Sequence, residues 1–144
     1  MKTWRKDQRG ASAVEFAIVL PLLVVFVFGI IEFGLIFYNK AMVTNASREA
    51  ARTGIVFREP RVTVAEIQTV VANYCNGMLV TFGGSANPTI TVPSGECVSH
   101  GDELVVDVAY QYDFLLIPDF LTAFFGGGLP GSVNITTQTR MRCE

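Results

Sequence analysis

Few side chains in this 144-residue chain have the type and spacing for chemistry, and the most distinctive ones surround the peptide bond between Gly10 and Ala11. Glu15 is the only charged residue from there to Ile31. Cutting the chain after Gly10 would create an α-amino group on Ala11, about 6 Å from Glu15 along a helix axis. That amine could neutralise the carboxylate in an apolar phase, where an unpaired charge is costly. The sequence therefore predicts a proteolytic boundary coupled to an ion pair.

The apolar run from residue 11 to residue 31 must position these groups, and as a helix of about 31 Å it is long enough to cross a bilayer. The ten residues before it carry four basic side chains against Asp7, a net charge of +3. Seven basic and twelve acidic side chains follow, a net charge of −5. This asymmetry predicts a cytoplasmic N-terminus and an exported remainder. The overall net charge of −2 disfavours a nucleic-acid partner.

Three interpretations of this N-terminal segment compete. A cleaved secretory signal would have a shorter apolar stretch, with small residues after it rather than before it, where Ala11, Ser12 and Ala13 lie here. A plain signal anchor would stay uncleaved. A prepilin-type signal is a basic leader ending in glycine, followed by a small first residue, a Glu at the fifth position, an aromatic residue and a long apolar helix. Counting from Ala11, Glu15 is fifth and Phe16 is sixth.

Residues 9–54 resemble the TadE-like family, which are pilin-like proteins of tight-adherence (Flp-type) pilus systems. The resemblance rests on Gly10, Glu15, Phe16 and the run Asn45-Ala46-Ser47-Arg48-Glu49-Ala50-Ala51-Arg52. It implies a minor pilin, or pseudopilin, that a prepilin peptidase processes and that acts in pilus assembly. The implied partners are the peptidase, the major pilin and other pilin-like subunits, and the inner-membrane assembly platform.

The alternative function is an uncleaved bitopic membrane protein with a periplasmic binding head. We divide the chain into a basic leader (1–10), a transmembrane and extended helix (11–54) that stops at Gly54, and a head (55–144). The expected location is the bacterial inner membrane, with the head in the periplasm or, after assembly, on the pilus at the cell surface. The sequence contains no nucleophile elbow, phosphate-binding loop or zinc-ligand spacing, so we expect no enzymatic activity and no cofactor.

The head is expected to be an α+β unit, with one helix packed on a small antiparallel sheet. Thr63 and Glu66 have the spacing of a capping box at the start of that helix, and Gly77 ends it. Strand patterns cover residues 78–82, 89–92, 103–112 and 132–142. The alternation is clearest in the third of these, whose apolar face comprises Leu104, Val106, Val108, Tyr110 and Tyr112.

Three features of the part expected to be exported are the cysteine pairing, the role of Glu32 and the position of an apolar segment. The three cysteines of this part allow one disulfide, for which Cys75–Cys97 is the first choice and Cys97–Cys143 the close alternative. Glu32 is interpreted as an interfacial anchor beside aromatic residues. The apolar segment 114–125 either covers the sheet or forms an exposed patch for neighbouring subunits or the membrane surface.

Overall fold

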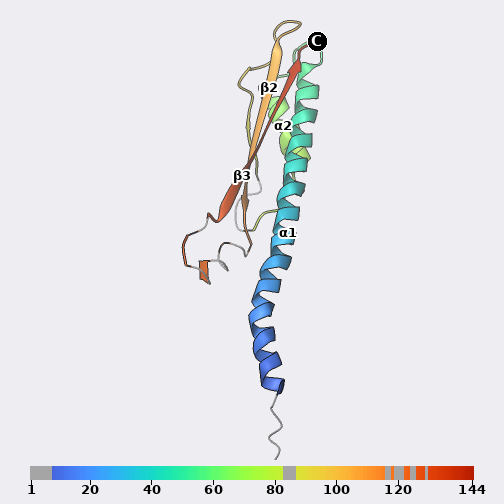
Figure 1. The fold of residues 1–144 in the computed structure, drawn as a ribbon. Helices are drawn as coiled ribbons and strands as arrows, with labels where there is room; N and C mark the ends of the chain where they lie inside the picture. The colour runs from blue at the N-terminus through green and yellow to red at the C-terminus, as the bar shows by residue number, and fades with distance from the viewer. Residues whose placement is uncertain (1–7, 83–86, 116–117, 119–121, 124–125, 129) are drawn as a thin grey trace, which may run out of the picture.

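A computed structural model describes residues 8–82, 87–115, 118, 122–123, 126–128 and 130–144. Figure 1 shows one long helix with a small head alongside its C-terminal half. The elements are α1 (Gln8–Ile55), α2 (Val64–Cys75), β1 (Thr89–Thr91), β2 (Glu103–Asp113) and β3 (Ser132–Arg142). The predicted α+β class, with one long apolar N-terminal helix before a sheet-containing head, is confirmed.

Helix α1 has two halves with different surroundings. Between Gly10 and Ile31 no residue is buried, although five residues between Pro21 and Gly29 are half-buried, and we call this stretch the uncovered half. From Glu32 to Ile55 one face of α1 lies against the head, and we call this stretch the covered half. Within the described part of the chain, α1 is the one helix long and apolar enough to cross a membrane. The helix continues through Pro21, which therefore does not end it.

The sheet has the order β1-β2-β3, and both pairings are antiparallel. Strand β2 is central, with Thr89 of β1 opposite Ala109 and Thr137 of β3 opposite Val108. The predicted alternation along β2 is confirmed, because its five inward side chains are buried: Leu104, Val106, Val108, Tyr110 and Tyr112. Helix α1 contacts β2 and β3, while α2 contacts α1 and β1, so the two helices share the inner face of the sheet.

Helix α2 begins as the sequence predicts. The Thr63 hydroxyl accepts a hydrogen bond from the Glu66 N–H, and the Glu66 carboxylate accepts one from the Thr63 N–H, which completes the capping box. Arg58 also donates to the Glu66 carboxylate. These hydrogen bonds, that of Arg58 first, lower the pKa of Glu66 from 4.5 to about 2. Ile67, Val71 and Cys75 form the buried face of the helix.

The predicted strand at residues 78–82 is wrong, and the reason is visible in its hydrogen bonds. The Asn39 side chain of α1 accepts from the Val80 N–H at 3.0 Å and donates to the Val80 carbonyl at 2.6 Å. The Tyr110 hydroxyl donates to the same carbonyl at 3.1 Å. Side chains thus satisfy the backbone groups that a neighbouring strand would otherwise bind. The glycine-rich sequence at residues 83–87 also predicts a turn, which lies largely outside the described residues.

Gly54 is not the stop of α1, which extends to Ile55. It is instead the point of closest approach between α1 and the head. A Cβ atom at position 54 would lie 2.5 Å from Leu104 Cδ2 of β2 and 2.8 Å from Ile67 Cδ1 of α2. Glycine is therefore needed here because three elements meet where a side chain would overlap the core.

Candidate assembly and processing site

The four predicted processing and assembly residues lie in the first turns of the uncovered half. Gly10, Ala11, Glu15 and Phe16 are all exposed, Phe16 to 63%. Ala11 and Glu15 are four residues apart in one continuous helix, so they lie on the same face. An amine created on Ala11 would therefore be positioned over the Glu15 carboxylate. The cleavage itself stays a prediction.

The start of α1 gives the Gly10–Ala11 bond little protection. Helix α1 begins at Gln8, so the bond lies within the first turn, and the backbone N–H groups of a first turn have no acceptor within the helix. A Cβ atom built on Gly10 would meet nothing within 4 Å. A side chain at position 10 therefore meets no steric obstacle, whereas a side chain at position 54 would overlap the core.

The covered half carries three buried polar residues, of which the sequence interpretation misassigned Glu32 and gave no individual role to Asn39 or Ser47. Glu32, Asn39 and Ser47 are at most 1% exposed, although each lies on a helix that the sequence marks as apolar. Ser47 exchanges a hydrogen bond of 2.7 Å with the Thr139 hydroxyl of β3. Their spacing of seven and eight residues places them on one helical face, together with the buried Val43, Ala46, Ala50 and Gly54. That shared periodicity is the signal that could have identified them.

The interpretation of Glu32 as an interfacial anchor is wrong. Its side chain is 1% exposed, and its Oε1 atom accepts a hydrogen bond of 2.9 Å from the backbone N–H of Leu115. The Tyr112 ring packs edge-on against Phe114, with ring centres 5.6 Å apart. Burial raises the pKa of Tyr112, and the nearby Glu32 carboxylate raises it further. Glu32 is thus an attachment point for the head rather than a group that faces lipid or water.

The disulfide forms between Cys97 and Cys143, with Cα atoms 5.8 Å apart, and Cys75 is a buried free thiol. The structure therefore contains the alternative pairing and not the first choice, Cys75–Cys97. Antiparallel pairing of β2 with β3 places Glu103 opposite Arg142, which brings the flanking cysteines together. Burial also raises the pKa of the Cys75 thiol, which keeps it protonated and unreactive.

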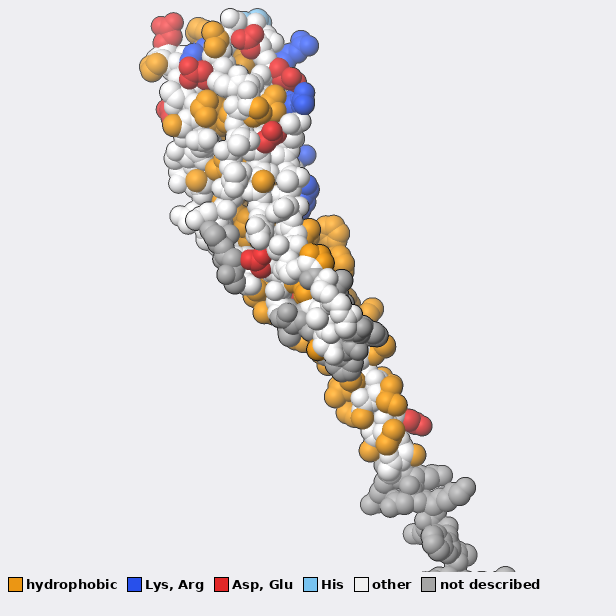
Figure 2. Space-filling view, turned by 90° about the vertical axis from the view of Figure 1, so that its left-hand side faces the viewer, with side chains coloured by type: hydrophobic (Ala, Val, Ile, Leu, Met, Phe, Trp, Pro, Cys, Tyr) orange, Lys and Arg blue, Asp and Glu red, His pale blue; other side chains and the backbone are white. Residues whose placement is uncertain are grey.

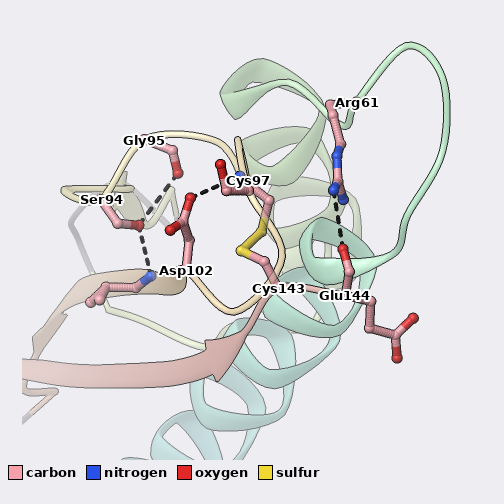
Figure 3. The surroundings of a disulfide bond; sticks show 9 residues. Arg61, Ser94, Gly95, Cys97, Asp102, Cys143 and Glu144 are labelled. Atoms are coloured by element: carbon pink, nitrogen blue, oxygen red, sulfur yellow. Dashed lines mark hydrogen bonds between the residues drawn. A yellow bond between two sulfur atoms is a disulfide. The ribbon is translucent and has the colours of Figure 1, made fainter.

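The disulfide lies beside the Arg61–Glu144 hydrogen bond (Figure 3), within a group of contacts that holds residues 143–144 against the head and α1. The Glu144 N–H donates to the Ile55 carbonyl at 3.1 Å, and Arg61 donates to the Glu144 carbonyl at 3.1 Å. The Asp102 carboxylate accepts from the Ser99 N–H and holds the loop that carries Cys97. These bonds fix the end of the head furthest from the uncovered half.

Charged and hydrophobic side chains separate along the molecule. Figure 2 shows acidic and basic side chains gathered at the end of the head furthest from the uncovered half, and hydrophobic side chains over the uncovered half of α1. Within the described residues, no group of three His, Cys, Asp or Glu side chains could hold a metal ion. The arrangement suits insertion of the uncovered half into a membrane, with the charged end outside it.

The uncovered apolar helix and its α+β head indicate a single-pass membrane protein. Residues 10–52 match the family model of TadE-like proteins. The match confirms the resemblance that the sequence suggested, and it indicates a pilin-like protein related to the Tad pilus. It begins at Gly10, the predicted boundary, and ends three residues before the end of α1. No curated protein and no solved structure matches the chain.

Proposed function

We propose that this chain is a TadE-like minor pilin that acts in the assembly of a tight-adherence (Flp-type) pilus. It is made as a precursor in the bacterial inner membrane, with its N-terminus in the cytoplasm and its head in the periplasm. A prepilin peptidase cuts it between Gly10 and Ala11. The mature helix then associates with the major pilin, other pilin-like subunits and the assembly platform. The proposed role is structural and includes no catalytic step.

The observation that carries the processing step is that Gly10 ends the basic leader five residues before Glu15 and is the residue at which the family match begins. Gly10 lies inside α1, where glycine costs about 0.5–1 kcal/mol relative to alanine. A Cβ atom there would meet nothing within 4 Å, whereas at Gly54 it would overlap two side chains of the core. Gly29 and Gly34 are equally free of contacts, so the position of Gly10, between the basic leader and the apolar run, is what fits a residue that another protein recognises. The peptidase is that protein in the proposal.

The position of Glu15 supports the assembly step. The residue lies on the uncovered half, where every neighbouring side chain of the helix surface is apolar or small. A carboxylate near the centre of a bilayer costs about 2.5–3.5 kcal/mol on insertion scales. Cleavage places a positive charge on Ala11, one helical turn away. Pairing of Glu15 with that amine, in its own subunit or in a neighbour, would offset the cost and set the register between subunits.

One observation favours the alternative, an uncleaved bitopic protein. Helix α1 includes both Gly10 and Ala11, and a peptidase must unwind a helical bond before it can cut it. The first turn of a helix frays most easily, because its N–H groups lack intrahelical partners. Glycine lowers the cost of unwinding further. The two candidate functions therefore differ in a measurable product, the new N-terminus.

Two substitutions, each paired with a control substitution, test the proposal in a host that carries the whole pilus system. Gly10→Arg should block cleavage, and Gln8→Arg, which adds the same charge two residues earlier, should not. Glu15→Val should be cleaved but should fail in piliation, whereas Glu49→Val, on the exposed part of α1 beside the head, should support both. A gel-shift assay reports processing, and electron microscopy reports pili. Normal piliation by an uncleaved Gly10→Arg protein would overturn the processing step.

The orientation has its own test. Alkaline phosphatase fused after Glu144 should be active, because the enzyme folds only after export to the periplasm. If alkaline phosphatase is inactive there and a reporter that works only in the cytoplasm is active at the same position, the basic leader does not set the proposed topology.

A further inference from the structure

The contacts between head and helix fix the height of each part of the head along α1. The Leu115 N–H binds Glu32, Val80 binds Asn39, and Lys40 donates to the Thr136 carbonyl of β3. Higher up, Glu144 binds Ile55. The attachment nearest the uncovered half is therefore the one at Glu32, one residue beyond Ile31. The ends of β2 and β3 that face the uncovered half, Asp113 and Ser132, pair near this attachment (Figure 1).

Burial of Glu32 extends the apolar surface of α1 beyond the uncovered half. Because its carboxylate faces the head, the outward surface of α1 carries no charge from Phe16 until Lys40. Those residues before Lys40 would measure about 36 Å as a helix, more than the roughly 30 Å of a hydrocarbon core. Phe33 and Phe37 are 59% and 69% exposed on this surface. With the membrane anchorage of the proposed function, this apolar surface carries the membrane boundary past Glu32, to the level at which Leu115 is attached.

The head itself exposes apolar side chains at the same height. Leu115 is 41% exposed although its backbone is held by Glu32, and Val133 at the start of β3 is 36% exposed. The sequence that continues from Leu115 to residue 125 contains a single charged residue, Asp119. We call Phe33, Phe37, Leu115 and Val133 the lower rim. It continues the apolar surface of the uncovered half onto the head.

We propose that the lower rim rests in the headgroup boundary of the outer leaflet, so that the head makes a second contact with the membrane beside α1. The partner is the phospholipid surface, because the rim is continuous with the helix that enters it. The contact is shallow, since Asp113 and Ser132 pair at the same end of the sheet and their polar groups stay near water. The Glu32–Leu115 hydrogen bond joins the two contacts and fixes the tilt of the head. The inference rests on the membrane anchorage within the proposed function and not on cleavage.

Tryptophan reporters in lipid vesicles test this contact. Trp4, the single tryptophan, is replaced by phenylalanine, and the full chain is reconstituted alone at a low protein-to-lipid ratio. The reporters are Leu115→Trp and Phe37→Trp on the rim, Leu23→Trp in the uncovered half, and Val98→Trp near the disulfide, where Val98 is 75% exposed. Because Leu115 contacts Glu32 through its backbone, its side chain can change without loss of that bond.

Phospholipids brominated either near the headgroup or near the bilayer centre then quench the reporters by depth. We expect the Leu115→Trp and Phe37→Trp reporters to lose intensity with the shallow label, Leu23→Trp with the deep label, and Val98→Trp with neither. If neither label quenches Leu115→Trp while the deep label quenches Leu23→Trp, the rim contact is wrong and the membrane anchorage of α1 stands. The lower rim would then suit contact with another protein. If Leu23→Trp is also unquenched, the anchorage in the proposed function fails, and the rim contact fails with it.

Discussion

The Glu32 carboxylate accepts a hydrogen bond from the backbone N–H of Leu115, across 83 residues of sequence. This bond is the attachment between α1 and the head that lies nearest the uncovered half. Together with the Asn39–Val80 and Glu144–Ile55 contacts, it attaches the head at three heights along α1. A force or a displacement applied to the membrane-embedded helix would therefore reach the head as a rigid motion.

Replacement of Glu32 should destabilise the head. Glu32→Leu removes the acceptor of the part-buried Leu115 N–H and the buried carboxylate, which should cost about 1 kcal/mol in the free energy of unfolding. Glu32→Gln retains an acceptor oxygen and should cost less. Urea unfolding of the full chain in detergent, followed by circular dichroism, measures both. Glu15→Leu is the matched control, because Glu15 touches no part of the head; a Glu32→Leu protein as stable as this control would contradict the prediction.

Two of the glycines of α1, Gly10 and Gly54, should respond oppositely to alanine. Gly54→Ala places a methyl group 2.5 Å from Leu104 Cδ2, and the resulting overpacking should lower the free energy of unfolding by about 1–3 kcal/mol. Gly10→Ala meets nothing within 4 Å and should leave the head unchanged while the helix gains up to about 1 kcal/mol. Equal midpoints in a urea titration would show that Gly54 does not determine the packing of α1 on the head.

Acid should weaken the start of α2 through Glu66. Because folding lowers the pKa of this carboxyl from 4.5 to about 2, its contribution to stability is complete above pH 4.5 and is lost as the pH falls towards 2. Glu66→Gln removes the titrating group, so the unfolding midpoint of that variant should depend less on pH in this window. The measurement compares the two proteins at matched pH values. Parallel pH profiles would show that the Arg58 and Thr63 contacts do not hold Glu66 in solution.

The exported protein should contain the Cys97–Cys143 bridge. It closes a loop with a sequence separation of 46, for which chain entropy gives a stabilisation of about 4 kcal/mol. Non-reducing peptide mapping should recover the Cys97 and Cys143 peptides as one species. An alkylating reagent should label Cys75 only after unfolding, because the thiol is buried with a raised pKa. Rapid labelling of Cys75 in the native protein, or a Cys75–Cys97 peptide, would contradict the structure.

Local patterns in the sequence predicted most of the elements. The capping box of Thr63 and Glu66 starts α2, and the alternation along β2 identifies its inward face from Leu104 to Tyr112. Both signals depend on residues a few positions apart. The strand expected at residues 78–82 failed because the Asn39 side chain, about 40 positions earlier, takes the place of a neighbouring strand.

The attachment of the head could not be predicted for the same reason. An apolar helix with a single acidic residue near its end is typical of an interfacial anchor, and only the position of Leu115 shows that Glu32 is covered. The choice between the two disulfides likewise needed the register of β2 with β3, which sets Glu103 opposite Arg142 beside the two cysteines. Sequence spacing alone favoured the shorter loop to Cys75.

The N-terminus of the mature protein is the most direct test of the proposed function. Protein is extracted from membranes of a host with the complete pilus system, and its N-terminal peptide and intact mass are measured by mass spectrometry. The same host without its prepilin peptidase serves as the control. The account predicts a chain that begins at Ala11 in the first host and retains residues 1–10 in the second. A chain that keeps its leader in both hosts, or that is cut elsewhere in both, would contradict it.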